Sequence, residues 1–248
     1  MIYTYINVQI MNSIKQNLNN LDEWDLYNGF FLMNDIERLR KFLMREHLFK
    51  KSLDIPGDIV EVGVFKGTGM AQLLKLREIF TPASNKKVIG FDLFSTSNDY
   101  KNTLNNEDNK LNEYYNRCDV KMENGIQKEE IQYFFDNMKL SNQRVGFNED
   151  IYQLIEGDVT TSIPSYLDNN PGFRISFLYI DLDIDNPTYT SLNLLFDRIV
   201  PGGIIVLDDY ACEKWTASNG IDRFLKEHPN LEVKTLEWGR SPAAYIVK

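Results

Sequence analysis

The chain has 248 residues, of which 43% are hydrophobic, and its formal net charge is −9. This length and hydrophobic content suit one large domain with a substantial core. The negative charge argues against a nucleic-acid-binding protein, which presents a basic face to phosphates. No apolar stretch is long enough to span a bilayer, so we expect no membrane partner.

Cysteine and histidine usage bears on the compartment and on metal chemistry. Cys118 and Cys212 form no Cys-x-x-Cys motif, which is typical of a reducing compartment. The N-terminus has no basic region followed by an apolar one, so no signal peptide is expected. With only His47 and His228 available, a structural zinc site is excluded on ligand count. We expect a cytoplasmic protein.

The first thirty residues are rich in asparagine and weakly patterned, and we expect them to be an appendage to a domain over 31–248. Asn34 and Glu37 then stand three residues apart, a spacing that predicts a helix with Asn34 as its N-cap. The apolar stripe of this helix is predicted at Ile36, Leu39 and Leu43.

A strand is predicted over 59–63, a helix over 68–80 and a second strand over 87–92. The next stretch, 95–125, is too polar to supply a core and too long for an ordinary connection. Apolar residues at helical spacing then predict an amphipathic helix over 125–140. We interpret 95–150 as a lid or substrate-side insertion; a surface excursion without function is an equal alternative.

The alternation of strands and helices resumes after this insertion. Asn186-Pro187 predicts the start of a helix, with Asn as N-cap and Pro in the first helical position. Pro201-Gly202-Gly203 predicts a turn. The alternation indicates an α/β fold with a mostly parallel sheet and helices on both faces. The remaining predicted elements are strands over 152–156, 175–181, 204–207, 231–236 and 243–247 and a helix over 222–228.

Two pairs of aspartates end two of the aliphatic strands: Asp181 with Asp183, and Asp208 with Asp209. Ligands of open α/β sheets bind at this carboxyl edge, and residues i and i+2 of a strand point the same way. Converging carboxylates raise one another's pKa unless a cation neutralises them, and oxygen ligands suit a hard ion such as Mg²⁺. The alternative is that single aspartates cap helices or start turns.

A glycine-containing loop joins the first predicted strand to the helix over 68–80. It runs from Glu61 through Gly63 to Gly67 and Gly69. Glycines permit such a turn and let a ligand approach closely. The spacing matches neither the dinucleotide fingerprint nor a P-loop, so a ligand loop and a tight turn remain equal readings.

Two further aspartates follow predicted strands. Asp92 ends the second strand, where an acidic side chain can accept hydrogen bonds from both ribose hydroxyls of a nucleotide. Asp158 follows Gly157 just beyond the third strand, where an adenine would lie against the sheet edge. A Gly-Asp pair is also an ordinary turn, so both readings of Asp158 stay open.

These motifs resemble class I S-adenosylmethionine-dependent methyltransferases. More narrowly, they are similar to the macrocin and mycinamicin O-methyltransferase family, which methylates sugar hydroxyls of antibiotics and related glycosides. The two aspartate pairs are the specific part of the resemblance, which covers about residues 30 to 248. Its segments are Glu61-Val-Gly-Val-Phe-Lys-Gly67, Phe91-Asp-Leu-Phe94, Ile180-Asp-Leu-Asp-Ile-Asp-Asn-Pro-Thr188, Pro201-Gly-Gly203 and Asp208-Asp-Tyr210.

The resemblance implies a seven-stranded Rossmann-like sheet and a divalent metal that helps to bind the sugar. Asp181, Asp208 and Asp209 would hold the metal, and Asp183 would be the general base. Asp185 departs from the pattern, because the family usually has an aromatic residue there, so the shape of the family's acceptor pocket is not carried over. Residues expected to contact the cofactor are Glu61, Gly63, Val64, Gly67, Thr68, Asp92 and Asp158.

The expected function is S-adenosylmethionine- and Mg²⁺-dependent methylation of a sugar hydroxyl in a glycoside or nucleotide sugar, in a natural-product or surface-polysaccharide pathway. The absence of a well-placed histidine favours a carboxylate base. Three alternatives remain: the same metal chemistry on a non-sugar diol, a metal-dependent phosphoester hydrolase, and a non-catalytic binding module. The expected partner is a small-molecule acceptor, and homo-oligomerisation is left open.

Overall fold

The structure is a computed structural model that describes residues 29–32, 36–94, 128–141, 144–147 and 150–248. The chain divides into two compact units, residues 1–40 and 41–248. The predicted cap Asn34, most of the predicted N-terminal appendage and the polar stretch 95–125 lie outside the described residues. The first unit contains a short helical segment at 29–32 and the first turn of α3 (Ile36–Lys50).

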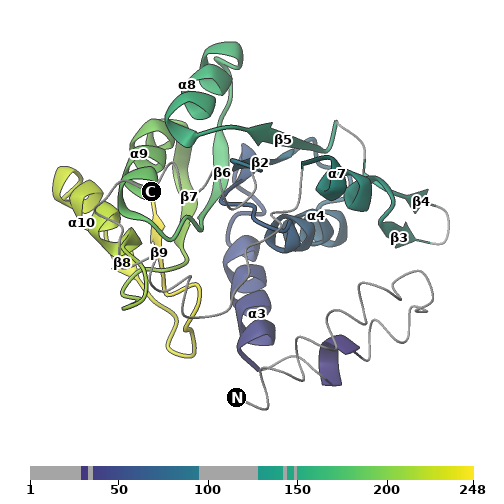
Figure 1. Cartoon of the computed structure of the whole chain (residues 1–248), viewed down its shortest axis with the longest axis horizontal. Coiled ribbons are helices and arrows are strands. Elements are labelled where there is room, and N and C mark those ends of the chain that lie inside the picture. Colours follow the sequence, from purple (N-terminus) through teal and green to yellow (C-terminus); the bar gives the residue numbers. More distant parts are fainter. Residues whose placement is uncertain (1–28, 33–35, 95–127, 142–143, 148–149) are drawn as a thin grey trace. The chain divides into compact units, whose positions relative to one another are not determined.

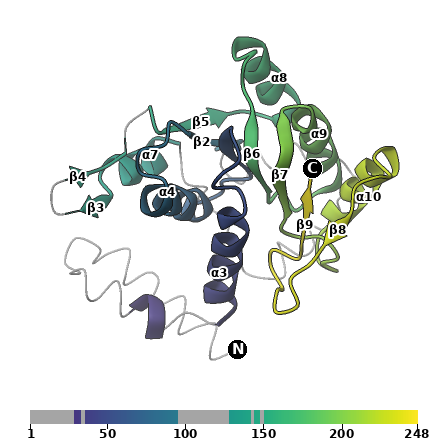
Figure 2. The same ribbon diagram turned by 180° about the vertical axis from the view of Figure 1, so that it is seen from behind.

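A seven-stranded sheet forms the centre of the second unit, in the order β5-β2-β1-β6-β7-β9-β8 (Figure 1; from behind, Figure 2). All neighbouring pairs from β5 to β7 are parallel, and β9 is antiparallel to both β7 and β8. The mostly parallel seven-stranded sheet is therefore confirmed. The strands are β1 (Asp58–Val62), β2 (Val88–Asp92), β5 (Tyr152–Glu156), β6 (Ile175–Ile180), β7 (Ile199–Leu207), β8 (Val233–Lys234) and β9 (Ala244–Val247).

Each face of the sheet carries its own hydrophobic core. Alternate residues of a strand point to opposite faces, so Tyr179 of β6 joins one core and Leu178 joins the other. The first core includes residues of α3 and α4 (Thr68–Phe80). The second includes residues of α8 (Val159–Asn169), α9 (Asp185–Phe196) and α10 (Ala217–Glu227). Helices thus cover both faces, as predicted.

The strand order reverses between β1 and β6. From β1 the chain goes through α4 to β2 on one side, whereas β6 lies on the other side of β1. Such a switch point opens a crevice outside the carboxyl ends of the two strands. The glycine loop follows β1 and the first aspartate pair follows β6, so the topology places both at this crevice.

The predicted helix over 125–140 is wrong at its C-terminal end. The helix α7 spans Lys128–Asp136, and β3 (Lys139–Ser141) pairs with β4 (Arg144–Val145). The helix stops because the chain folds back on it: Gly146 donates a hydrogen bond to the Met138 carbonyl and Phe147 donates to the Phe135 carbonyl. Gly146 has φ +82°, and a Cβ there would lie 1.8 Å from the Asp136 carbonyl oxygen.

Three predicted boundaries in the second half of the chain are also wrong, and one helix was not predicted. α9 begins one residue before the predicted cap, because the Thr216 hydroxyl accepts from the Asp185 amide at 3.1 Å and Ile184 takes the N-cap position. β7 begins at Ile199 and continues through Pro201-Gly202-Gly203, since Gly202 donates to the Lys248 carbonyl at 2.7 Å. α8 was not predicted, and α10 begins five residues earlier than expected.

The apolar stripe predicted for α3 is also displaced. Leu43 is 46% exposed, whereas the buried face carries Met44, Arg45, Leu48 and Phe49. Two basic side chains, Lys41 and Arg45, reach inward from this helix to acidic partners, which explains the offset. Among the described residues, no helix has both the length and the apolar character required to cross a membrane.

Candidate functional site

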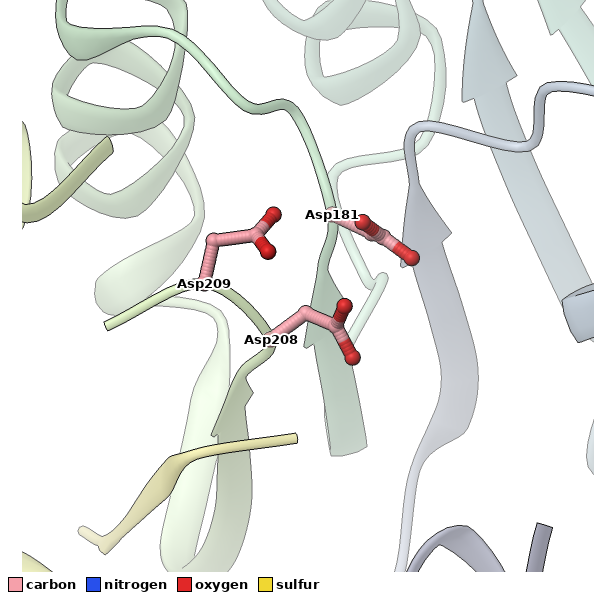
Figure 3. Close-up of side chains that lie close together, drawn as sticks. All are labelled: Asp181, Asp208 and Asp209. Carbon is pink, nitrogen blue, oxygen red and sulfur yellow. The ribbon is translucent and has the colours of Figure 1, made fainter. Parts of the chain in front are cut away.

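Three aspartates converge at the carboxyl ends of β6 and β7. Ile180 pairs with Leu207 at the ends of these neighbouring strands, so Asp181 lies beside Asp208 and Asp209. One carboxylate oxygen of each residue lies within 4.8 Å of the corresponding oxygens of the other two, and Figure 3 shows the three side chains close together. The structure thus brings together the residues predicted to hold a metal.

Asp208 is the most firmly held member of this carboxylate cluster. It is 3% exposed, and the Tyr179 hydroxyl donates to its Oδ1. Its Oδ2 accepts from Lys41 Nζ at 2.7 Å and from Ser241 Oγ at 3.1 Å. The Lys41 ammonium also donates to Asp181 Oδ2, at 3.1 Å, and so joins two members of the cluster.

The electrostatics of the cluster show a shortage of positive charge. Burial and then the Asp208 charge raise the pKa of Asp181 to about 7. Burial and then the charges of Asp208 and Asp183 raise the pKa of Asp209 to about 9. When ionised, the three clustered carboxylates carry −3, and the Lys41 ammonium brings the sum to −2. A divalent cation would balance this remainder.

Asp209 supplies an independent indication of a missing partner. Its Oδ2 is buried and accepts no hydrogen bond from any described residue. A buried carboxylate oxygen without a partner is costly. Converging, anionic oxygen donors are the ligands that Mg²⁺ prefers. The residues present therefore fit a hard divalent cation held by Asp181, Asp208 and Asp209.

Asp183 lies beside this cluster in a different backbone conformation. β6 ends at Ile180, so Asp181 and Asp183 do not share a strand, and the common direction predicted for them from strand alternation is wrong. Asp183 has φ +61°, which is unusual for a residue other than glycine. Its carbonyl accepts from the Thr216 and Ala217 amides at 3.0 and 3.2 Å, which anchors it to the start of α10.

A buried network lies behind the carboxylates. Glu61 of β1 is 1% exposed, and its Oε1 lies 3.4 Å from an Arg45 guanidinium nitrogen. The same guanidinium lies over the Tyr179 ring, 4.1 Å from its centroid. Burial is the main cause that raises the pKa of Glu61, to about 8. A Cβ on Gly69 would lie 2.0 Å from Glu61 Oε1, so this carboxyl packs directly against the first turn of α4.

The glycine loop lies against the carboxylate cluster. Gly63 has φ +93°, and a Cβ there would lie 1.8 Å from the carbonyl oxygen of Asp181. Gly67, with φ +80°, is the N-cap of α4, and Thr68 is the first residue of that helix. The Val64 side chain is 3% exposed and belongs to the core. The loop predicted to bind the cofactor therefore lies next to the predicted metal ligands.

Asp92 connects the end of β2 to this loop. Its Oδ2 accepts from the Phe65 amide at 2.8 Å, and its Oδ1 accepts from the Phe94 amide at 3.0 Å. Phe65 and Phe94 both have positive φ, at +51° and +47°. The Asp92 side chain therefore stabilises an unusual backbone conformation on the edge where a ribose was expected.

Asp158 is the N-cap of α8. Its Oδ1 accepts from the Thr160 amide at 2.8 Å and from the Thr160 hydroxyl at 2.6 Å. The preceding residue, Gly157, donates its amide to the Asp92 carbonyl at 2.9 Å. Asp158 is thus a helix cap near the predicted ribose position, and a direct contact with the cofactor stays a prediction.

Four residues of the site were not predicted from the sequence: Lys41, Arg45, Tyr179 and Ser241. Lys41 and Arg45 stand four residues apart on α3, a spacing that places them on one face. Tyr179 lies in a fully buried strand, where a tyrosine hydroxyl needs a partner. Nothing in the sequence distinguishes Ser241.

The chain is similar to known O-methyltransferases. The model of a family described as macrocin-O-methyltransferase matches residues 30–234. The apo structure of CalS11, a TDP-rhamnose 3'-O-methyltransferase of calicheamicin biosynthesis, is 23% identical, with a TM-score of 0.67 over 97% of this chain and 93% of that one. The O-methyltransferase NovP is 18% identical, with a TM-score of 0.65 over 85% of this chain and 80% of that one. Among curated proteins, none matches the chain significantly.

Proposed function

The chain belongs to the macrocin-O-methyltransferase family and is an O-methyltransferase. From this premise we propose that it transfers a methyl group from S-adenosylmethionine to a sugar hydroxyl of a glycoside or nucleotide sugar, with the help of Mg²⁺. The observation that carries the proposal is the convergence of Asp181, Asp208 and Asp209 beside the glycine loop. The substrate named for CalS11, TDP-rhamnose, supports a sugar acceptor.

Asp181, Asp208 and Asp209 are proposed to hold the metal. When bound, the ion would supply Lewis acidity, which lowers the pKa of a coordinated hydroxyl. Tyr179, Lys41 and Ser241 fix the orientation of Asp208.

Asp183 is proposed as the general base. A sugar hydroxyl is a poor nucleophile because it is almost fully protonated at neutral pH, so a nearby carboxylate must accept its proton as the methyl group moves. Asp183 lies next to Asp209, whose pKa its charge raises, and its backbone is anchored to α10. It can therefore take a proton at the edge of the metal site without being one of the three clustered ligands.

The cofactor is proposed to lie along the glycine loop. Gly63, Val64 and Gly67 lie in this loop, which adjoins Asp181, and Thr68 begins the helix that follows it. Asp92 and Asp158 would face the nucleoside part, and Glu61 would support the loop from below. The sulfonium is already reactive, so the main task of the loop is to align the acceptor oxygen, methyl carbon and sulfur.

A methyl-transfer screen tests this function. The protein would be incubated with methyl-labelled S-adenosylmethionine, Mg²⁺ and a panel of nucleotide sugars, glycosides and non-sugar diols. We expect label to appear in a sugar-containing acceptor, on a hydroxyl group. Methyl transfer to the non-sugar diols alone would contradict the sugar assignment. If the protein did not bind the labelled S-adenosylmethionine, the cofactor assignment would be contradicted. We propose that the reaction takes place in the cytoplasm, where the cofactor is made available.

A further inference from the structure

Lys41 is a positive charge built into the carboxylate cluster. Its ammonium lies 2.7 Å from Asp208 Oδ2 and 3.1 Å from Asp181 Oδ2, and its side chain is only 22% exposed. The residue comes from α3, whereas its partners follow β6 and β7. Lys41 therefore joins the ends of two strands from outside the sheet.

The contacts of Lys41 divide the cluster unequally. It donates to Asp181 and Asp208, while the Oδ2 atom of Asp209 accepts from no described residue. Among the donors to Asp208, Lys41 carries a charge and Tyr179 and Ser241 do not. An ammonium in this position supplies one of the charges that three carboxylates require, and it repels a second cation that enters the same site.

We propose that Lys41 is the resident counter-ion of the metal site, a positioning residue that acts through Asp181 and Asp208. Before the metal binds, it holds these two carboxylates together against their mutual repulsion. Because the Lys41 ammonium is positively charged, it also lowers the affinity of the site for divalent cations. This inference rests on the metal site of the proposed function and assigns to Lys41 the control of its affinity.

Isothermal titration of Mg²⁺ into protein stripped with EDTA tests the proposal. Lys41→Met removes the charge and keeps much of the side-chain volume, so we expect Mg²⁺ to bind about tenfold tighter or more, since a nearby cation repels the metal strongly at short range. Lys41→Arg keeps the charge and should bind Mg²⁺ like the wild type. Lys50→Met is the matched control, because Lys50 is an exposed lysine of the same helix that pairs with Glu46.

Thermal unfolding gives a second readout that does not depend on activity. Without metal, Lys41→Met should have a lower Tm than the wild type, because its carboxylates lack a counter-ion. Saturating Mg²⁺ should then raise the Tm of Lys41→Met more than that of the wild type, since tighter binding to the folded state stabilises it further. Lys50→Met should show the same Mg²⁺-dependent shift as the wild type.

The outcomes separate this inference from the metal site itself. If the wild type binds Mg²⁺ and Lys41→Met binds it no tighter, the counter-ion role is overturned and the metal site stands. If no variant binds Mg²⁺, the metal site fails and the inference fails with it. If Lys41→Met folds only with Mg²⁺, the metal has replaced the ammonium, which supports the proposal. If it stays unfolded with Mg²⁺ while Lys41→Arg folds, the metal cannot replace the ammonium and the proposal is overturned.

Discussion

The aspartates of the site differ in what surrounds them, although their side chains are identical. Asp208 accepts hydrogen bonds from three side chains, whereas Asp209 has a buried oxygen without a partner among the described residues. Asp183 has a left-handed backbone and stands outside the cluster of three. These differences are consistent with the division proposed above, in which Asp181, Asp208 and Asp209 hold the metal and Asp183 is the general base.

Asp183→Asn tests the general base. The amide is nearly isosteric with the carboxylate but cannot accept the proton, so turnover at saturating Mg²⁺ should fall by roughly 10²–10⁴-fold, the usual worth of positioned acid–base catalysis. Mg²⁺ affinity, measured by calorimetry, should stay within a few-fold of the wild type. Asp197→Asn, at an exposed position after α9, is the control. Recovery of normal turnover at higher Mg²⁺ would show that Asp183 is a ligand instead.

Asp92→Ala tests the ribose contact. We expect S-adenosylmethionine to bind more weakly by about 1.5–3 kcal/mol, the range for lost hydrogen bonds to a charged group. The variant also releases the Phe65 and Phe94 amides, so circular dichroism and the thermal transition should confirm that it folds. A folded variant with unchanged cofactor affinity would contradict the assignment.

At the scale of elements, the strands could be predicted because aliphatic runs reveal burial on both faces. β5 was predicted to the residue, and β1, β2 and β6 to within one residue. α8 was missed because Pro164 and several hydroxyl residues mask its helical pattern, and its signal is the cap at Asp158. The face of α3 was misjudged because Lys41 and Arg45 point inward, a charge pairing that periodicity does not reveal.

Asp158→Ala tests the cap of α8. Loss of the hydrogen bonds to Thr160 should lower the free energy of unfolding by about 0.5–2 kcal/mol, as for other N-caps. Urea unfolding followed by circular dichroism measures this difference. Asp168→Ala, an exposed change near the other end of the same helix, should have a smaller effect. Equal stability of Asp158→Ala and the wild type would show that the cap contributes nothing.

At the scale of the whole molecule, the topology decides where the candidate site lies. The strand order reverses between β1 and β6, so the glycine loop and the carboxylate cluster meet at one edge of the sheet. The four aspartates that follow predicted strands, together with the resemblance to class I methyltransferases, were enough to predict that the glycine loop and the carboxylate cluster lie at the same edge. The supporting residues were not predictable, because Lys41 and Ser241 reach the cluster, and Arg45 reaches Glu61, through tertiary contacts that no local pattern encodes.

The central claim is that Asp181, Asp208 and Asp209 hold a divalent metal that methyl transfer requires. The most direct test measures the methyl-transfer rate of EDTA-treated protein as Mg²⁺ is added back, for the wild type and for Asp209→Asn. We predict that EDTA abolishes transfer and that Mg²⁺ restores it in the wild type. Asp209→Asn should require more Mg²⁺, because one charged ligand has become neutral. Full activity of the wild type in EDTA would contradict the account.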